Sequence, residues 1–232
     1  MKANRLVLLV VAGVSALSLS GCAQTGNVAA QVGDRTVPTS DVDFLARMQC
    51  DSLNAAAKDP AQAAQGGVQM VPTSQIRSSM VNTLVQAELD RQLAAKEHLS
   101  YDTTTLRNAM AQFQSILKSV PAADRDRFQS MVEGIYRGQL ELYDLAQRQL
   151  ADQGVSSPTQ DQVNKAIAAI QDKYRKSVHV KVNPLYGADQ SGTAGSTDPS
   201  LSRPVSSFAK QSTSAQPDSA WVGKLPADQR CG

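Results

Sequence analysis

The cysteines are the residues of this sequence whose chemistry is best defined by their neighbours. Cys22 ends a Leu-Ser-Gly-Cys stretch over 19–22 that matches a lipobox, in which small residues admit the signal peptidase and the thiol receives diacylglycerol. An apolar run over 6–17 follows a basic start. This run is shorter than the roughly 20 residues that span a bilayer, which disfavours a transmembrane helix and leaves an ordinary secretory signal as the alternative.

The lipobox marks the boundary between a signal peptide and the mature chain. We expect residues 1–21 to be a signal peptide, residues 22–27 to be a lipidated tether, and Cys22 to be the lipidation site. Two acyl chains anchor a protein far better than one, because each buried methylene contributes about 0.8 kcal/mol. The mature chain should therefore stay on the extracytoplasmic face of the cell membrane, with the lipid membrane as a partner.

Cys50 and Cys231 remain once Cys22 is acylated. An even pair in an oxidising compartment is usually bonded, so we expect a Cys50–Cys231 disulfide. The alternative is a buried thiol at Cys50 and a free thiol at Cys231. A metal site is not expected, because the two histidines, His98 and His179, lie in unrelated parts of the sequence.

The charge balance argues against a nucleic-acid partner. Removal of residues 1–21 takes two of the 23 basic residues and no acidic one, which leaves 21 basic against 21 acidic residues. A nucleic-acid-binding protein carries a clustered basic excess that neutralises phosphates, and this sequence has no such run. We therefore expect no nucleic-acid binding.

Motifs of catalysis or cofactor binding are absent from the sequence, which has no G-x-S-x-G, phosphate-binding glycine loop, H-E-x-x-H or EF-hand loop. His179 alternates with valines, which favours a solvated position. Acidic pairs such as Asp124 with Asp126 are typical of solvated helix faces rather than of paired catalytic carboxylates. We expect neither an enzyme nor a cofactor.

Apolar residues recur every three or four positions in several segments, which predicts a mainly α protein of about five helices. The expected helices cover about 40–53, 73–98, 103–119, 122–153 and 157–174. Residues 54–72 are rich in Ala, Gln and Gly, which indicates a connection or a frayed helix end. Ser157, with Pro158 after it and Gln160 three residues on, predicts a capping box at the start of the last helix.

Residues 28–37 and 178–182 are the segments with strand character. The first has two apolar stretches around a Gly-Asp pair, which is typical of a hairpin, and the second alternates valines with polar residues. Neither can satisfy its backbone alone. We expect them to pair and to close one helical domain over 28–187.

Residues 188–232 form a tail in which Ser, Thr, Pro and Gly abound. Up to about position 219 this composition cannot bury enough apolar surface to fold alone. Trp221, Val222 and Leu225 are an apolar exception shortly before Cys231. We expect the tail to fold back and dock on the helical domain through Trp221 and Cys231.

Two sequence motifs in this order resemble a known family. Gln-Val-Gly-Asp-Arg-Thr-Val over 31–37 precedes Ser40 and Asp41, and Val-Lys-Val-Asn-Pro-Leu-Tyr-Gly over 180–187 follows the helices. With the lipobox, the arrangement resembles the N-terminal chaperone region of SurA-type and PrsA-type extracytoplasmic foldases, especially short actinobacterial lipoproteins with a SurA N-terminal domain. The resemblance covers about 28–187. Such relatives often have Arg where this chain has Leu185.

The resemblance implies a helical cradle that holds unfolded or nascent exported proteins, with no cofactor and no covalent chemistry. Residues 155–178 leave no room for the parvulin isomerase domain of full-length relatives, so isomerase activity is not implied. The function expected from it is a membrane-anchored, ATP-independent holdase or folding factor. The alternative is a structural or accessory envelope lipoprotein that binds one specific partner, and an enzyme is a third, weaker possibility.

Methionine and aromatic side chains on the expected helices could supply an adaptable apolar surface for clients, because methionine fits many shapes and aromatic rings offer large contact areas. The alternative is that they belong to the core, since their spacing is the spacing that buries a helix face. The candidate client-binding residues are Met110, Phe113, Met131, Tyr136 and Tyr143.

Overall fold

The structure is a computed structural model that describes residues 27–64, 66–187, 206–211, 214 and 217–232. Its helices are α1 (Thr39–Ala57), α2 (Pro60–Ala64), α3 (Thr73–Lys96), α4 (Thr103–Gln112), α5 (Gln114–Ser119), α6 (Arg125–Asp152), α7 (Gln160–Arg175), α8 (Ser207–Gln211) and α9 (Ser219–Val222). Its strands are β1 (Val28–Val32), β2 (Arg35–Pro38), β3 (Val71–Pro72), β4 (Val180–Val182) and β5 (Arg230–Cys231). The mainly α fold is therefore confirmed. The expected signal peptide and Cys22 lie outside the described residues.

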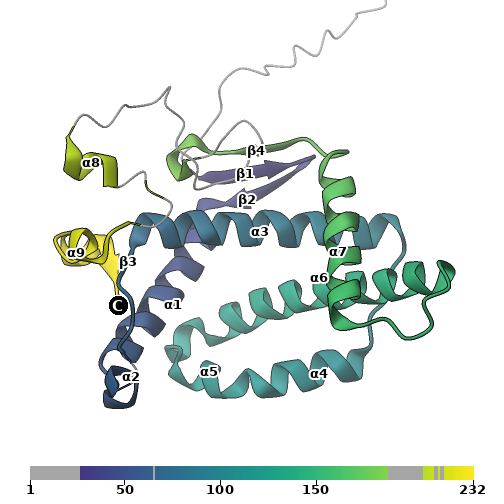
Figure 1. Cartoon of the computed structure of the whole chain (residues 1–232), viewed down its shortest axis with the longest axis horizontal. Coiled ribbons are helices and arrows are strands. Elements are labelled where there is room, and N and C mark those ends of the chain that lie inside the picture. The colour runs from purple at the N-terminus through teal and green to yellow at the C-terminus, as the bar shows by residue number, and fades with distance from the viewer. Residues whose placement is uncertain (1–26, 65, 188–205, 212–213, 215–216) are drawn as a thin grey trace, which may run out of the picture.

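A three-stranded antiparallel sheet of order β2-β1-β4 joins the two ends of the helical region. The β1–β2 hairpin turns at Gly33, whose φ of 57° favours glycine. β4 pairs with the other edge of β1, so that Ala30 faces Val182 and Val32 faces Val180. The predicted pairing of the hairpin with the later strand is confirmed. Figure 1 shows this sheet lying along α3.

The segment after β4 fastens the sheet in place. Asn183 is buried, its Nδ2 donates to the Val28 carbonyl at 3.1 Å, and its Oδ1 accepts the Leu185 N–H at 3.0 Å. Ser78 on α3 donates to the carbonyl of the buried Tyr186 at 3.0 Å. The side chain of Leu185 is 83% exposed. In the Asn-Pro-Leu-Tyr motif, the asparagine therefore satisfies backbone groups and the tyrosine packs in the core.

α3 is the central helix. Its residues Val81, Val85 and Leu89 are at most 1% exposed and form one core cluster with the sheet. Gln92 donates to the Val32 carbonyl at 3.0 Å, which ties the next turn of the helix to the hairpin. The remaining faces of α3 contact α1, α6 and α7. This helix therefore positions the sheet, α1, α6 and α7.

A buried carboxyl group lies where α3, α6 and α7 meet. Asp90 is 4% exposed and accepts hydrogen bonds from Gln86 at 2.7 Å and from Gln171 on α7 at 3.1 Å. Burial raises the pKa of Asp90, and these two hydrogen bonds only partly oppose that rise. On α6, a Cβ at Gly138 would lie 3.2 Å from the Asp90 Cβ, which is a tight contact, so α3 and α6 approach each other closely at this glycine.

The start of α7 differs from the predicted one. Thr159, rather than Ser157, caps the helix: its hydroxyl accepts the Gln162 N–H at 3.3 Å, and Gln162 Oε1 accepts the Thr159 N–H at 2.8 Å. Both positions fit the capping-box pattern. The first buried residue of α7 is Val163, so a start at 158 would add an exposed turn without packing.

The C-terminal segment lies against α1, β3 and α3. β5 pairs antiparallel with β3, and Trp221 and Val222 of α9 are buried. Cys231 is fully buried and bonded to Cys50, with their Cα atoms 5.1 Å apart, so the predicted disulfide is confirmed. The β3–β5 pair was not expected, because the sequence indicated strands only at 28–37 and 178–182. Of the tail, residues 188–205, 212–213 and 215–216 lie outside the described residues.

Candidate functional site

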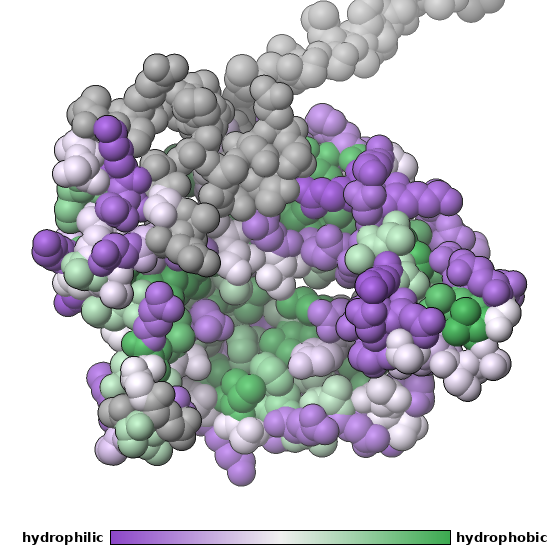
Figure 2. Space-filling model, viewed as in Figure 1, coloured by the Kyte–Doolittle hydropathy of each residue, from purple (hydrophilic) through white to green (hydrophobic). Residues whose placement is uncertain are grey.

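Apolar side chains gather in a hollow on one face of the molecule. Figure 2 shows this hollow in the region where α1, α3, α5 and α6 of Figure 1 come together. The same region of the fold contributes one cluster of packed side chains, which we call the methionine–aromatic cluster: Phe44, Leu45, Met48, Met80, Leu84, Val120, Phe128 and Met131. Four of the eight are buried and four are only partly buried, so the cluster is both core and surface.

Four aromatic rings continue the cluster along α6. The centroid of Phe128 lies 6.4 Å from that of Phe44 on α1 and 5.8 Å from that of Phe113, which in turn lies 6.4 Å from that of Tyr136. Such pairs contribute about 0.5–1.5 kcal/mol each beyond their area burial. The row leads from the methionine–aromatic cluster to a second cluster that contains Met110.

The position of Phe113 depends on a break in the helix that was predicted over 103–119. α4 ends at Gln112 and α5 begins at Gln114, so Phe113 is the junction between two helices. Both α4 and α5 pack against α6. As a result, the Phe113 ring contacts both Phe128 and Tyr136. A single helix was expected because the apolar period continues through the junction.

The structure brings four of the five candidate residues together. Met110, Phe113 and Tyr136 share the second cluster, and Met131 belongs to the methionine–aromatic cluster. Met110 is 8% exposed, whereas the other three are half-buried. Tyr143 lies apart from them, two turns farther along α6, where it packs in the cluster between α6 and α7.

Sequence reasoning missed Phe44, which is 3% exposed. The three-to-four-residue spacing in the expected helix over 40–53 predicts an apolar face of Val42, Leu45 and either Met48 or Gln49. α1 buries residues on more than one side because it packs on both α3 and the sheet, so a single stripe understates its core. The position of this aromatic residue between the predicted core residues Val42 and Leu45 was the sequence feature that could have indicated its burial.

Arginines border the aromatic row. The guanidinium carbon of Arg127 lies 4.3 Å from the Phe44 ring centroid, and Arg127 also pairs with Asp41 at 2.7 Å. Arg47 lies 5.5 Å from the same centroid and pairs with Asp124 at 3.0 Å. Exposed pairs of this kind add little stability, but a cation over an aromatic face is attracted to it. The apolar hollow therefore has a charged rim whose cations already have partners.

The chemistry available at this surface is non-covalent. Its partly buried methionines and rings can adapt to apolar side chains of different shapes. On α5, Ile116 is 45% exposed, which extends the apolar character towards solvent. Within the described ranges, no group of three or more His, Cys, Asp or Glu residues is arranged to hold a metal ion.

Comparison with protein families identifies this architecture. The family model of the SurA-like N-terminal domain matches residues 3–151. The chain belongs to the SurA-like N-terminal domain family. The match contains the hairpin and helices α1 to α6 almost completely, whereas α7, β4 and the C-terminal segment follow it. Comparison with the curated proteins and with the solved structures gave no significant match.

Family membership indicates a chaperone-like role outside the cytoplasm. The SurA N-terminal domain is a non-catalytic, chaperone-type domain, and no parvulin domain was matched in this sequence. In the part of the chain that the structure describes, no helix is long and apolar enough to cross a membrane.

Proposed function

We propose that this protein is a membrane-anchored, ATP-independent holdase that binds unfolded or nascent exported proteins outside the cytoplasm and carries out no isomerisation. The observation that carries the proposal is the methionine–aromatic cluster in a chain of the SurA-like N-terminal domain family. A half-buried surface of rings and methionines binds many apolar sequences weakly and few of them tightly. That is the property a holdase needs.

The lipobox supports anchoring through Cys22. Residues 23–27 separate this cysteine from β1, which begins at Val28. Fully extended, a tether of that length reaches about 20 Å. An acylated Cys22 would thus hold the sheet within about 20 Å of the bilayer surface, where chains that leave a translocation channel are still unfolded.

Weak binding explains how a client leaves without nucleotide. Burial of roughly 300 Å² of client apolar surface at about 25 cal/mol per Å² gives about 7.5 kcal/mol. Association itself costs on the order of 4–15 kcal/mol, and ordering an unfolded segment adds to that cost. The net affinity is therefore low, and release competes with folding of the client.

Suppression of aggregation tests the proposal. The chain from residue 23 onward, which lacks the lipidation cysteine, should suppress the aggregation of several unrelated unfolded proteins in the absence of ATP. Met131→Gln in the methionine–aromatic cluster, combined with Ile116→Gln on the neighbouring helix α5, removes apolar surface and should reduce suppression at least threefold. Leu185→Gln is the control, because Leu185 is also an exposed apolar residue but lies beyond β4. No suppression by the wild-type chain at stoichiometric excess would contradict the holdase proposal.

Crosslinking in the native membrane separates the holdase from an accessory lipoprotein. A photoreactive residue in place of Ile116, which is 45% exposed on α5, would trap proteins that contact this side of the molecule. Many different trapped proteins are expected for a holdase. A single trapped partner would favour the accessory envelope lipoprotein instead.

A further inference from the structure

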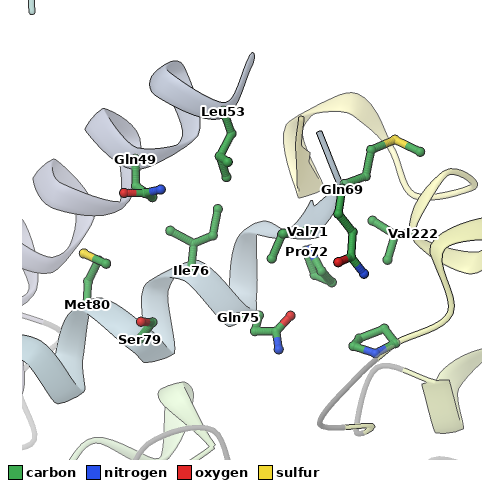
Figure 3. A pocket seen from close by; sticks show the side chains of 12 residues that line it. Gln49, Leu53, Gln69, Val71, Pro72, Gln75, Ile76, Ser79, Met80 and Val222 are labelled. Atoms are coloured by element: carbon green, nitrogen blue, oxygen red, sulfur yellow. The ribbon is translucent and has the colours of Figure 1, made fainter. Parts of the chain in front are cut away.

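A second concave site lies on the other side of Met80 from the methionine–aromatic cluster. It is a cavity of about 750 Å³ between α1, α3, β3 and the C-terminal segment, and Figure 3 shows it from close by. Cavities that bind small ligands in proteins usually measure about 300–1,000 Å³. This cavity is therefore large enough for more than one amino-acid side chain.

The walls of the cavity are apolar. Leu53 on α1 and Ile76 on α3 point towards one another across it, as Figure 3 shows. Val71 on β3 and Val222 on α9 form the opposite wall. Val222 is held there because the C-terminal segment is paired with β3 and bonded to α1 through the disulfide. The site is thus assembled from elements that are far apart in the sequence.

The rim of the cavity is polar and carries amide groups. Gln49, Gln69 and Gln75 contribute side-chain amides, and Ser79 contributes a hydroxyl. All four residues are exposed, so the rim faces solvent. A side-chain amide both donates and accepts hydrogen bonds, which is the combination that a peptide backbone presents.

The lining also defines the charge of the ligand. Of the described residues, the twelve that line the cavity include no ionisable side chain. A charged group that entered would lose hydration without gaining a partner, which is costly. An acyl chain would fill the apolar walls but would leave the amide rim unused. Neutral peptide is the class that matches both the walls and the rim.

We infer that this cavity binds an uncharged, apolar segment of a client polypeptide, with aliphatic side chains between Leu53 and Ile76 and the client backbone along Gln49 and Ser79. The inference rests on the proposed function, since it names the client segment that a second site of the holdase recognises. Met80 is part of both the cavity lining and the methionine–aromatic cluster. Met80 therefore lies between the two surfaces, and a client segment that extends past this side chain would contact both.

A pair of charge substitutions tests the inference. Gln49→Glu with Ser79→Glu places two carboxylates at the cavity rim, at exposed positions where neither has to be buried. Ser52→Glu with Ser74→Glu is the matched control, because it adds the same two charges at exposed positions of the same two helices outside the lining. Circular dichroism and urea unfolding establish that both variants fold like the wild type.

The probe is a short peptide of Leu, Val, Asn and Ser with blocked ends, measured by isothermal titration calorimetry. The wild type should bind it, the rim variant should bind it at least fivefold more weakly, and the control should stay within twofold of the wild type. Equal affinities of the three proteins, or no binding by the wild type, would overturn the inference. Binding of monomeric dodecyl maltoside without binding of the peptide would overturn it in favour of an acyl chain.

The aggregation assay distinguishes failure of the cavity site from failure of the holdase proposal. Loss of peptide affinity in the rim variant supports the cavity site even if the wild type suppresses no aggregation, in which case only the holdase proposal fails. Normal suppression by the wild type together with unchanged peptide affinity in the rim variant leaves the holdase proposal intact and refutes the cavity site.

Discussion

Removal of the Cys50–Cys231 disulfide should cost this protein much of its stability. The two cysteines are 181 residues apart in the sequence, so the bond closes a very long loop. In the chain-entropy model, a loop of that length restricts the unfolded chain enough to contribute about 5 kcal/mol at 25 °C. Small proteins have a total free energy of unfolding of only about 5–15 kcal/mol. Cys50→Ser with Cys231→Ser should therefore lower it by about 3–5 kcal/mol.

The non-covalent contacts of the C-terminal segment are too few to make up for the stability lost with the disulfide. β5 and β3 pair over two residues each, and the Gly232 N–H donates to Asn54 Oδ1 at 2.9 Å. Trp221 and Val222 are buried, but the indole N–H of Trp221 has no hydrogen-bond partner in the described part of the chain. Without the disulfide, the segment should open locally before the rest of the protein unfolds.

Urea unfolding of the oxidised wild type, the reduced wild type and the double serine variant measures the effect. Reduced wild type and variant should agree, because both lack the bond, and their unfolding slope should exceed that of the oxidised protein since the uncrosslinked chain exposes more surface. Amide exchange should show faster opening of 219–232 than of α3. A loss below about 1 kcal/mol would refute the loop-entropy argument.

Two further predictions concern other residues of the chain. Cys22→Ser should abolish metabolic lipid labelling and leave the protein unprocessed or released from the membrane; continued labelling would show that the lipobox interpretation is wrong. Asp90→Asn should raise the free energy of unfolding at neutral pH, because burial raises the pKa of Asp90 in the folded state above its unfolded value, so that ionised Asp90 destabilises the fold. This penalty disappears as the pH falls through the raised folded pKa towards the ordinary value of about 4, so the difference between variant and wild type should shrink over that range. Urea unfolding of both proteins at several pH values measures it, and a difference that is constant with pH would contradict the assignment.

The sequence predicts the large helices and the closing sheet because their signals are local. The three-to-four-residue period marks α1, α3, α6 and α7, and the alternation of valines over 178–182 marks β4. The Cys50–Cys231 bond follows from counting cysteines once Cys22 is set aside. These features need no knowledge of which elements pack together.

The features that the sequence did not predict depend on tertiary contacts. β3 and β5 are two residues each, too short for any periodic signal, and they pair only because the disulfide and α9 bring the segments together. The break at Phe113 serves contacts with α6, and the burial of Phe44 reflects packing on several sides of α1. The cavity beside Ile76 could not be predicted for the same reason, since its walls come from four separate elements.

The 181 residues between Cys50 and Cys231 also impose an order on biogenesis. If the chain is exported during synthesis, at about 5–20 residues per second, Cys50 emerges roughly 10–40 s before its partner. During that interval the only other cysteine in the sequence is Cys22. In an exported chain, acylation of Cys22 would consume the one competing thiol before Cys231 arrives. Lipid attachment would then prevent a wrong disulfide between Cys22 and Cys50, so that Cys50 stays available for Cys231.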